Sequence, residues 1–168
     1  QLDAHRTRYF RIGPIKPTNV VTNPYPEFMT DWQAPWAVFM TQANGESTIH
    51  ETVFEGRFSY VQELAKMGAK IDFYDPNVED HETFYNFNWD DRKEGYHQGI
   101  RLTGPALLHN AVLRVDDIRA GATLVLAALV AQGKSYLHGV ELIDRGYETI
   151  EERLTKLGAA VSRIKEEE

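Results

Sequence analysis

The clearest apolar pattern in the chain lies between residues 117 and 131. An α-helix over this range carries apolar side chains on nearly every side, at Ala120, Leu124, Ala127, Ala128 and Val130. A helix that is apolar all round is buried on all sides. We therefore expect this helix to lie between two layers of the fold, starting at Asp116-Asp117 and ending before Gly133.

A second helix is predicted over residues 31–43. Thr30 and Gln33 have the spacing of a capping box, in which two side chains and two backbone N–H groups bond reciprocally. Pro35 falls in the first turn, where its missing N–H does no harm. Asn44-Gly45 supplies a left-handed stop, so this helix has a marked start and a marked end.

Each predicted helix is followed by a β-rich segment, a second helix closed by a glycine, and a closing strand. In the first series these are 47–54, Gly68 and 69–74, and in the second they are 135–143, Gly158 and 159–164. In the last helix apolar residues recur at spacings of three and four, at Tyr147, Ile150, Leu154 and Leu157. Helix, strand, helix, strand, twice over, predicts an α/β fold.

The two series predict an internal duplication of residues 30–74 as 116–164. The offset is 86 residues between Asp31 and Asp117 and 90 residues between Gly68 and Gly158. Matched pairs between them are Ala34 with Ala120, Gly45 with Gly133, His50 with His138, Arg57 with Arg145, and Leu64 with Leu154. The alternative is that any two helix-strand units share a glycine after each helix.

Between the two series, residues 75–98 have no clean period. They place aromatic side chains among seven carboxylates and two basic residues, at Phe84, Tyr85, Phe87, Trp89 and Tyr96. We expect a surface excursion or hairpin pinned by its aromatics, with a partner-binding lobe as the alternative. Residues 20–164 are then expected to form one domain, with 1–19 as a lead-in and 165–168 as a charged tail.

Composition limits the function classes. A chain of 168 residues is one domain long. Its formal net charge of −7 argues against nucleic acid as a partner, and the absence of Cys excludes disulfides, thiolate zinc sites and cysteine nucleophiles. The longest run free of charge and of strongly polar groups, 120–131, is too short for a membrane span, and no secretory signal is visible near Gln1. We expect a cytoplasmic protein, and the first residue indicates a fragment of a longer one.

Matched charged residues are the best candidates for chemistry, because a core has no packing use for them. Asp31 and Asp117 open equivalent helices, and Arg57 and Arg145 precede equivalent second helices. Asp31 is by default a capping carboxylate, but Thr30 can already cap, which leaves Asp31 able to accept a proton.

Arg119 stands in the first turn of its helix, where its charge opposes the helix dipole at a cost of about 0.3–1 kcal/mol. Asp116 or Asp117 could compensate within the chain. Alternatively, Arg119 and the helix N–H groups bind an anion such as phosphate or carboxylate, with Arg145 as a second fork. His50 and His138 are expected to be structural, since the histidines lack metal-ligand spacing, and no P-loop is present.

Four motifs follow one another along the chain: Pro24-Tyr25-Pro26-Glu27-Phe28-Met29-Thr30-Asp31, Glu51-Thr52-Val53-Phe54-Glu55-Gly56-Arg57-Phe58, Asp117-Ile118-Arg119-Ala120, and Asp144-Arg145-Gly146-Tyr147-Glu148 through Leu157-Gly158-Ala159. Together they resemble the UDP-N-acetylglucosamine 1-carboxyvinyltransferase family of enolpyruvyl transferases. The resemblance spans 20–164 apart from 75–98. It implies part of an inside-out α/β barrel built from repeated units, and transfer of enolpyruvyl from phosphoenolpyruvate to the 3-hydroxyl of UDP-N-acetylglucosamine, the first committed step of peptidoglycan synthesis.

The resemblance also implies roles for single residues, without any cofactor or metal. Asp31 would take the hydroxyl proton, and Val53, Phe54 and Arg57 would contact the UDP-sugar. Arg119 and Arg145 would hold the phosphate and carboxylate of phosphoenolpyruvate, with Asp117 lining that site. Asp31, Asp117, Arg119 and Arg145 are thus the predicted catalytic residues.

Several departures from the family bear on these roles. Glu27 stands where Gly is usual, Met29 where Pro is usual, and Gly56 where Asn is common. The family's Cys loop and its early phosphate-binding Lys precede the part that this chain resembles, so we expect a C-terminal portion that is inactive alone. The alternatives are a segment of the sister enzyme acting on 3-phosphoshikimate, whose strand motif is Lys-Glu-rich, and a non-catalytic binding module that uses the aromatics of 84–96.

Overall fold

The computed structural model describes residues 7–164; residues 1–6 and 165–168, which include part of the predicted lead-in and the predicted tail, lie outside the described part. The larger sheet has the order β1 (Val20–Val21), β2 (Gly45–His50), β4 (Gly99–Gly104) and β3 (Lys70–Tyr74). β1 is parallel to β2, while β4 is antiparallel to both of its neighbours. A second, parallel sheet joins β5 (Val112–Arg114) to β6 (Tyr136–His138).

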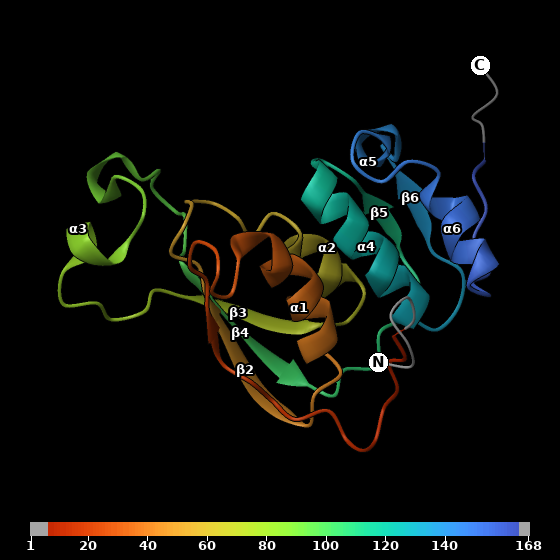
Figure 1. Ribbon diagram of the computed structural model, residues 1–168, viewed down its shortest axis with the longest axis horizontal. Helices are drawn as coiled ribbons and strands as arrows, with labels where there is room; N and C mark the ends of the chain where they lie inside the picture. The colour runs from red at the N-terminus through yellow and green to blue at the C-terminus, as the bar shows by residue number, and fades with distance from the viewer. Residues whose placement is uncertain (1–6, 165–168) are drawn as a thin grey trace.

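The helices divide the molecule into a body and a lobe (Figure 1). In the body, the 3₁₀ turn η1 (Thr30–Trp32) leads into α1 (Gln33–Met40), which lies with α2 (Val61–Lys66) over the larger sheet. α1 packs against α4 (Ile118–Val130), and α5 (Glu141–Asp144) and α6 (Ile150–Lys156) follow. The lobe carries α3 (His81–Phe84) and the 3₁₀ turn η2 (Trp89–Asp91) and projects from the opposite end of the molecule to α6. The predicted α/β class is confirmed.

The predicted helix is confirmed as α4, but its predicted burial on all sides is wrong, because Leu126, Leu129 and Val130 are exposed. Leu124 and Ala127 are completely buried, and α4 contacts α1, α2 and α5. Gly121 allows this close packing, because a Cβ at that position would lie 2.6 Å from a side-chain carbon of Ile143 and 2.7 Å from one of Val115. Within residues 7–164 no helix is long and apolar enough to cross a bilayer.

Strand β4 was absent from the elements predicted above. It lies between β2 and β3, so the closing strand of the first series pairs with β4 rather than with β2. Its pattern is alternating: Ile100 and Leu102 are fully buried, whereas Arg101 and Thr103 are exposed. Ile100 faces Ile49 across the ladder and contributes to the core beneath α1 and α2.

The capping box predicted for α1 is wrong, and the helix is shorter than predicted. The Thr30 hydroxyl donates to Glu51 Oε2 at 2.7 Å, and the Gln33 side chain is buried with other partners. α1 ends at Met40 rather than at residue 43, since the backbone of Thr41 bonds Ala106 and the chain then turns toward β2. Gly45, with φ of 141°, begins β2 instead of capping the helix.

The second series agrees with its prediction only in part. Gly68 and Gly158 do close equivalent helices, because the Ala69 N–H bonds the Leu64 carbonyl and the Ala159 N–H bonds the Leu154 carbonyl. This shared cap supports the duplication, which stays a prediction.

The predicted closing strand at 159–164 is wrong, since these residues have no ladder partner in the described part of the chain. The strand predicted at 135–143 shortens to β6, and α5 begins within its range. α6 starts later than the apolar spacing indicated, because Thr149 adopts left-handed backbone angles and leaves Tyr147 outside the helix.

Residues 75–98 form a long connection between two paired strands. Tyr74 of β3 pairs with Gly99 of β4, so the excursion is the loop of a hairpin. Inside it, Trp89 stacks on Tyr85 at 4.5 Å and on His81 at 4.2 Å between ring centroids. The prediction of a hairpin pinned by its aromatics is confirmed.

Candidate functional site

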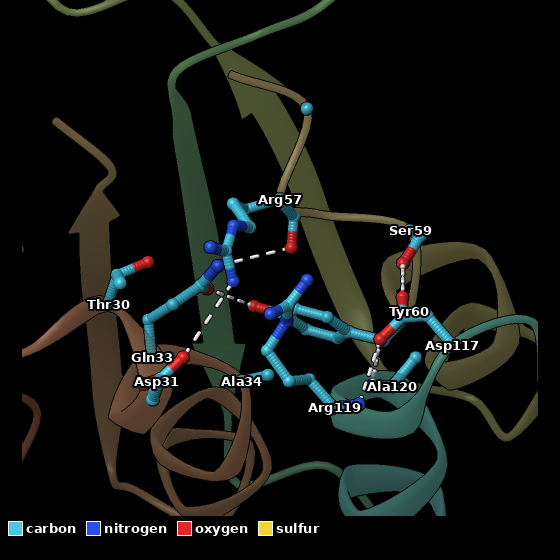
Figure 2. Close-up of a pocket in the computed structure, with 11 residues that line it drawn as sticks. Thr30, Asp31, Gln33, Ala34, Arg57, Ser59, Tyr60, Asp117, Arg119 and Ala120 are labelled. Carbon is cyan, nitrogen blue, oxygen red and sulfur yellow. Dashed lines mark hydrogen bonds and ion pairs between the residues drawn. The ribbon is translucent and has the colours of Figure 1, made fainter. Parts of the chain in front are cut away.

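A small cavity lies between η1, the loop before α2 and the first turn of α4 (Figure 2). It encloses about 60 Å³ and is lined by Thr30, Asp31, Gln33, Ala34, Gly56, Arg57, Ser59, Tyr60, Asp117, Arg119 and Ala120. Four of the predicted site residues are among these: Asp31, Arg57, Asp117 and Arg119. The fold thus brings charged residues of both series together around one cavity. The size of this cavity suits a small anion.

Arg57 is the most constrained charged side chain of this cavity. Its side chain is only 14% exposed, and its Nη1 lies 3.8 Å from Oδ1 of Asp31, whose own side chain is 68% exposed. The guanidinium sits over the Phe54 ring, 4.0 Å from the centroid. Nη1 is buried and has no hydrogen bond within the described chain. A donor of this kind is suited to an oxyanion.

Two guanidinium groups meet at the cavity. Burial lowers the pKa of Arg57, and the nearby charge of Arg119 lowers it further, while the carboxylates of Glu51, Asp31 and Asp117 oppose both effects. Figure 2 shows the Arg57 and Arg119 side chains among the residues that line the same cavity. Because two cations repel, a bound anion between them would be stabilised by both.

Asp117 has both carboxylate oxygens engaged. Oδ1 caps α4 by accepting from the backbone N–H of Arg119 at 2.8 Å and of Ala120 at 3.0 Å, and the Ser59 hydroxyl donates to Oδ2 at 3.0 Å. Burial raises the pKa of Asp117, but these hydrogen bonds outweigh it and leave the pKa below its ordinary value. Asp117 therefore remains ionised and fixes the first turn of α4.

Arg119 is the second residue of α4, in the first turn as predicted. Its charge also lowers the pKa of Asp117. Compensation within the chain, one of the two alternatives for Arg119, is thus present at Asp117. It does not remove the other alternative, because the Arg119 side chain still lines the cavity beside Arg57.

Beneath the cavity lies a buried polar network that sequence reasoning missed. Glu51 is completely buried and accepts from Thr30 and from the backbone N–H groups of Val53, at 2.8 Å, and Phe54, at 3.1 Å. Gln33 donates to the Arg57 carbonyl at 3.1 Å and accepts from the Tyr60 hydroxyl at 2.7 Å. The segment around Asp31 is thereby tied twice to the Arg57 loop. Gln33 was mistaken for a cap, and only its place among apolar helix positions could have indicated its burial.

The remaining predicted residues lie outside the cavity lining. Val53 and Phe54 adjoin it through Glu51 and through the ring of Phe54 beneath Arg57. Arg145 is the exposed C-cap of α5 and does not line this cavity. The binding of an anion by Arg145 stays a prediction, as does the contact of Val53 and Phe54 with the UDP-sugar.

His50 and His138 occupy strands, as predicted. Burial lowers the pKa of His50 to about 4, and its Nε2 hydrogen-bonds the Tyr85 hydroxyl at 3.0 Å, which supports a structural role. His138 is the last residue of β6. Within residues 7–164 no group of three or more His, Asp or Glu side chains is placed to hold a metal ion.

Sequence comparison relates the chain to one family of known proteins. Residues 3–154 match the EPSP synthase (3-phosphoshikimate 1-carboxyvinyltransferase) family profile. A relative from Symbiobacterium thermophilum, named UDP-N-acetylglucosamine 1-carboxyvinyltransferase 2, is 42% identical over 92% of this chain and 31% of its own length. A UDP-N-acetylglucosamine 1-carboxyvinyltransferase from Agrobacterium fabrum is 39% identical over 89% of this chain and 30% of its own length.

Solved structures give the same picture. The crystal structure of the enolpyruvyl transferase NikO from Streptomyces tendae superposes with a TM-score of 0.69 at 28% sequence identity. The match covers 89% of this chain and 29% of that one. The chain thus spans about a third of the length of the proteins that it resembles.

Proposed function

The chain belongs to the EPSP synthase (3-phosphoshikimate 1-carboxyvinyltransferase) family, and from this we propose that it forms part of an enzyme that transfers enolpyruvyl from phosphoenolpyruvate to the 3-hydroxyl of UDP-N-acetylglucosamine. The observation that carries the proposal is the cavity lined by Arg57, Arg119 and Asp31, in which the two arginine charges influence each other. The choice of acceptor rests on relatives of 38 to 42% identity that are named for it.

The arginine pair would bind the donor. Phosphoenolpyruvate carries a phosphate and a carboxylate, and guanidinium groups bind both through paired hydrogen bonds. Arg119 would hold this anion in register with Arg57 beside it. Arg145 is proposed as a further ligand, reached by a part of the substrate that extends beyond the 60 Å³ cavity.

Asp31 would act on the acceptor. Its exposed carboxylate is held near Arg57 and can accept the proton of the sugar hydroxyl. The sugar oxygen then bonds to C2 of the donor as C3 gains a proton. In a second step the C2–O bond to phosphate breaks while C3 loses a proton, which restores the C2–C3 double bond and releases inorganic phosphate. Val53 and Phe54 would contact the UDP-sugar. Asp117 would orient α4 and thereby Arg119, since its own oxygens are already bonded.

The acid that protonates C3 is not assigned to this chain. Its relatives are about three times as long, and we propose that their preceding part supplies that acid and further donor contacts. The reaction would be the first committed step of peptidoglycan synthesis, in the cytoplasm. It needs neither a metal nor a cofactor.

The first test is anion binding by the 168-residue chain. We expect phosphoenolpyruvate and inorganic phosphate to bind, as measured by calorimetry, and Arg119→Ala to weaken both by roughly tenfold or more, since each loses a charge-assisted hydrogen bond. Arg101→Ala is the matched control, because Arg101 is an exposed arginine of β4 that pairs with Glu46.

Unchanged binding in Arg119→Ala, or an equal loss in Arg101→Ala, would contradict the anion assignment. The two alternatives are also separated here. Binding of 3-phosphoshikimate in preference to UDP-N-acetylglucosamine would indicate the sister activity. If none of these ligands binds, the remaining alternative is the non-catalytic binding module.

A further inference from the structure

The excursion of residues 75–98 contacts the loop that carries Arg57. This loop, residues 52–57, joins β2 to the segment before α2. The Asn86 N–H donates to the Thr52 carbonyl at 2.8 Å, and the Lys93 N–H donates to Glu55 Oε2 at 3.0 Å. Two residues of the loop are therefore bonded to a segment that lies more than 30 positions later in the chain.

Tyr96 makes the third contact, at Gly56. The backbone of Gly56 is left-handed, with φ of 64°, and a Cβ at this position would lie 2.5 Å from Cε2 of Tyr96. The tyrosine ring therefore fills the space that any side chain at position 56 would need. The Tyr96 ring can occupy this place only because residue 56 is a glycine. Gly56 directly precedes Arg57 in the chain.

Tyr96 is itself held from behind. Its carbonyl accepts from Arg92 Nη1 at 3.0 Å, and the Arg92 guanidinium lies 4.0 Å from the centroid of the Trp89 ring. Trp89 stacks on Tyr85, whose hydroxyl bonds His50 on β2. A continuous set of contacts thus runs from β2 through the excursion and back to loop 52–57.

Loop 52–57 is consequently held from two sides. Glu51 bonds the N–H groups of Val53 and Phe54 from the buried side, and the excursion bonds or covers Thr52, Glu55 and Gly56 from the outer side. The Arg57 side chain emerges at the end of this loop and lines the cavity.

We infer that Tyr96 is a positioning residue, which holds loop 52–57 and so places the Arg57 guanidinium at the anion cavity. The excursion is then a brace for the site rather than a lobe for a separate partner. This inference rests on the proposed function, because it assigns the brace to the affinity of that same cavity.

The test compares Tyr96→Ala with Tyr96→Phe and Phe84→Ala in the 168-residue chain. Tyr96→Ala should weaken phosphate binding about tenfold, because part of the binding free energy is then spent on ordering loop 52–57. Tyr96→Phe keeps the ring and should bind phosphate as the parent chain does. Phe84 is the matched control: its side chain is 41% exposed against 37% for Tyr96, and its ring contacts His50 and Tyr85 instead of the loop. Phe84→Ala should lower the Tm and leave the phosphate Kd unchanged.

A second pair of variants tests the fit at position 56. Gly56→Asn should weaken phosphate binding in the parent chain, where the new side chain meets the Tyr96 ring. Combined with Tyr96→Ala it should cause no further loss, since asparagine tolerates left-handed backbone angles. Fully additive losses would overturn the inference, as would a wild-type Kd in Tyr96→Ala or an equal loss in Phe84→Ala.

Failure of the proposed function gives a different result. A parent chain that binds neither phosphate nor phosphoenolpyruvate contradicts the proposed function. Amide hydrogen exchange of Val53, Phe54 and Arg57 then still decides whether the excursion holds the loop. Faster exchange at these amides in Tyr96→Ala, but not in Phe84→Ala, supports the brace, and unchanged exchange overturns it.

Discussion

At the scale of single residues, buried polar side chains hold the segments that carry the charged residues of the cavity. Asp31 and Arg57 are recognisable because they are charged and recur in sequence. Glu51 and Gln33 are not recognisable in this way. Their side chains nevertheless hold the loop and the 3₁₀ turn that carry Arg57 and Asp31. A buried acceptor that satisfies three donors is costly to remove, since each donor is left without a partner.

Glu51→Ala is therefore expected to be strongly destabilising. It leaves the N–H groups of Val53 and Phe54 and the hydroxyl of Thr30 unbonded, and the free energy of unfolding should fall by about 2–4 kcal/mol. Glu51→Gln keeps an acceptor of the same shape and should lose less than half of that. Glu46→Gln is the control, because Glu46 is an exposed carboxylate of β2, the strand that ends just before Glu51, and should change stability by less than about 0.5 kcal/mol.

Urea denaturation of the three variants measures these differences. Equal stability of Glu51→Ala and Glu46→Gln would show that the polar network beneath the cavity does not contribute to the free energy of unfolding.

At the scale of elements, β2 is joined to the excursion through His50. Burial holds the pKa of His50 at about 4, against 6.5 in an unfolded chain. Between these values a falling pH protonates the unfolded chain before the folded one, so the free energy of unfolding decreases from about pH 6.5 down to about pH 4. The junction between sheet and lobe is thus more stable at neutral pH.

His50→Gln should remove this part of the pH dependence. The measure is the difference in the free energy of unfolding between pH 7 and pH 5, which should be smaller in His50→Gln than in the parent chain. His109→Gln, at an exposed histidine that bonds the neighbouring Asn110 carbonyl, should keep the parent's difference. A His50→Gln variant with the full difference would assign the effect to other groups.

The elements that the sequence predicts well are those whose signals are local. The α4 helix is recognisable from its apolar residues and from Asp117, and the ends of α2 and α6 from Gly68 and Gly158. Elements defined by distant partners are predicted poorly. α1 ends early because Thr41 bonds Ala106, and residues 159–164 form no strand because no neighbour pairs with them. β4 could have been predicted from the alternation of Ile100 with Arg101.

The same division holds for the site. The sequence pairs Asp31 with Asp117 and Arg57 with Arg145 as matched positions of the two series. Such a match does not tell which side chains lie close together in the folded chain. The structure places Arg57 with Arg119 at the cavity and leaves Arg145 outside its lining. Ser59 and Tyr60, which contact Asp117 and Gln33, carry no signal in the sequence that separates them from ordinary loop residues.

At the scale of the whole molecule, the proposed reaction needs an acid that protonates C3, and the proposal assigns that role to no residue of this chain. We expect the purified 168-residue chain to bind phosphoenolpyruvate without transferring enolpyruvyl, because no acid for C3 is assigned to it. Phosphate release with UDP-N-acetylglucosamine present is the measurement. Release above that of the Arg119→Ala variant would contradict this expectation and place the acid within these residues.

The strand order leaves β3 at an outer border of the larger sheet, with one side of its backbone facing no neighbouring strand in the described part. Such a border can recruit a second polypeptide in extended form and start fibrous growth. Lys70 and Asp72 are exposed on β3, and their charges would have to lose water wherever another copy stacked there. We therefore expect these two exposed charges to disfavour the stacking of a second copy on this edge.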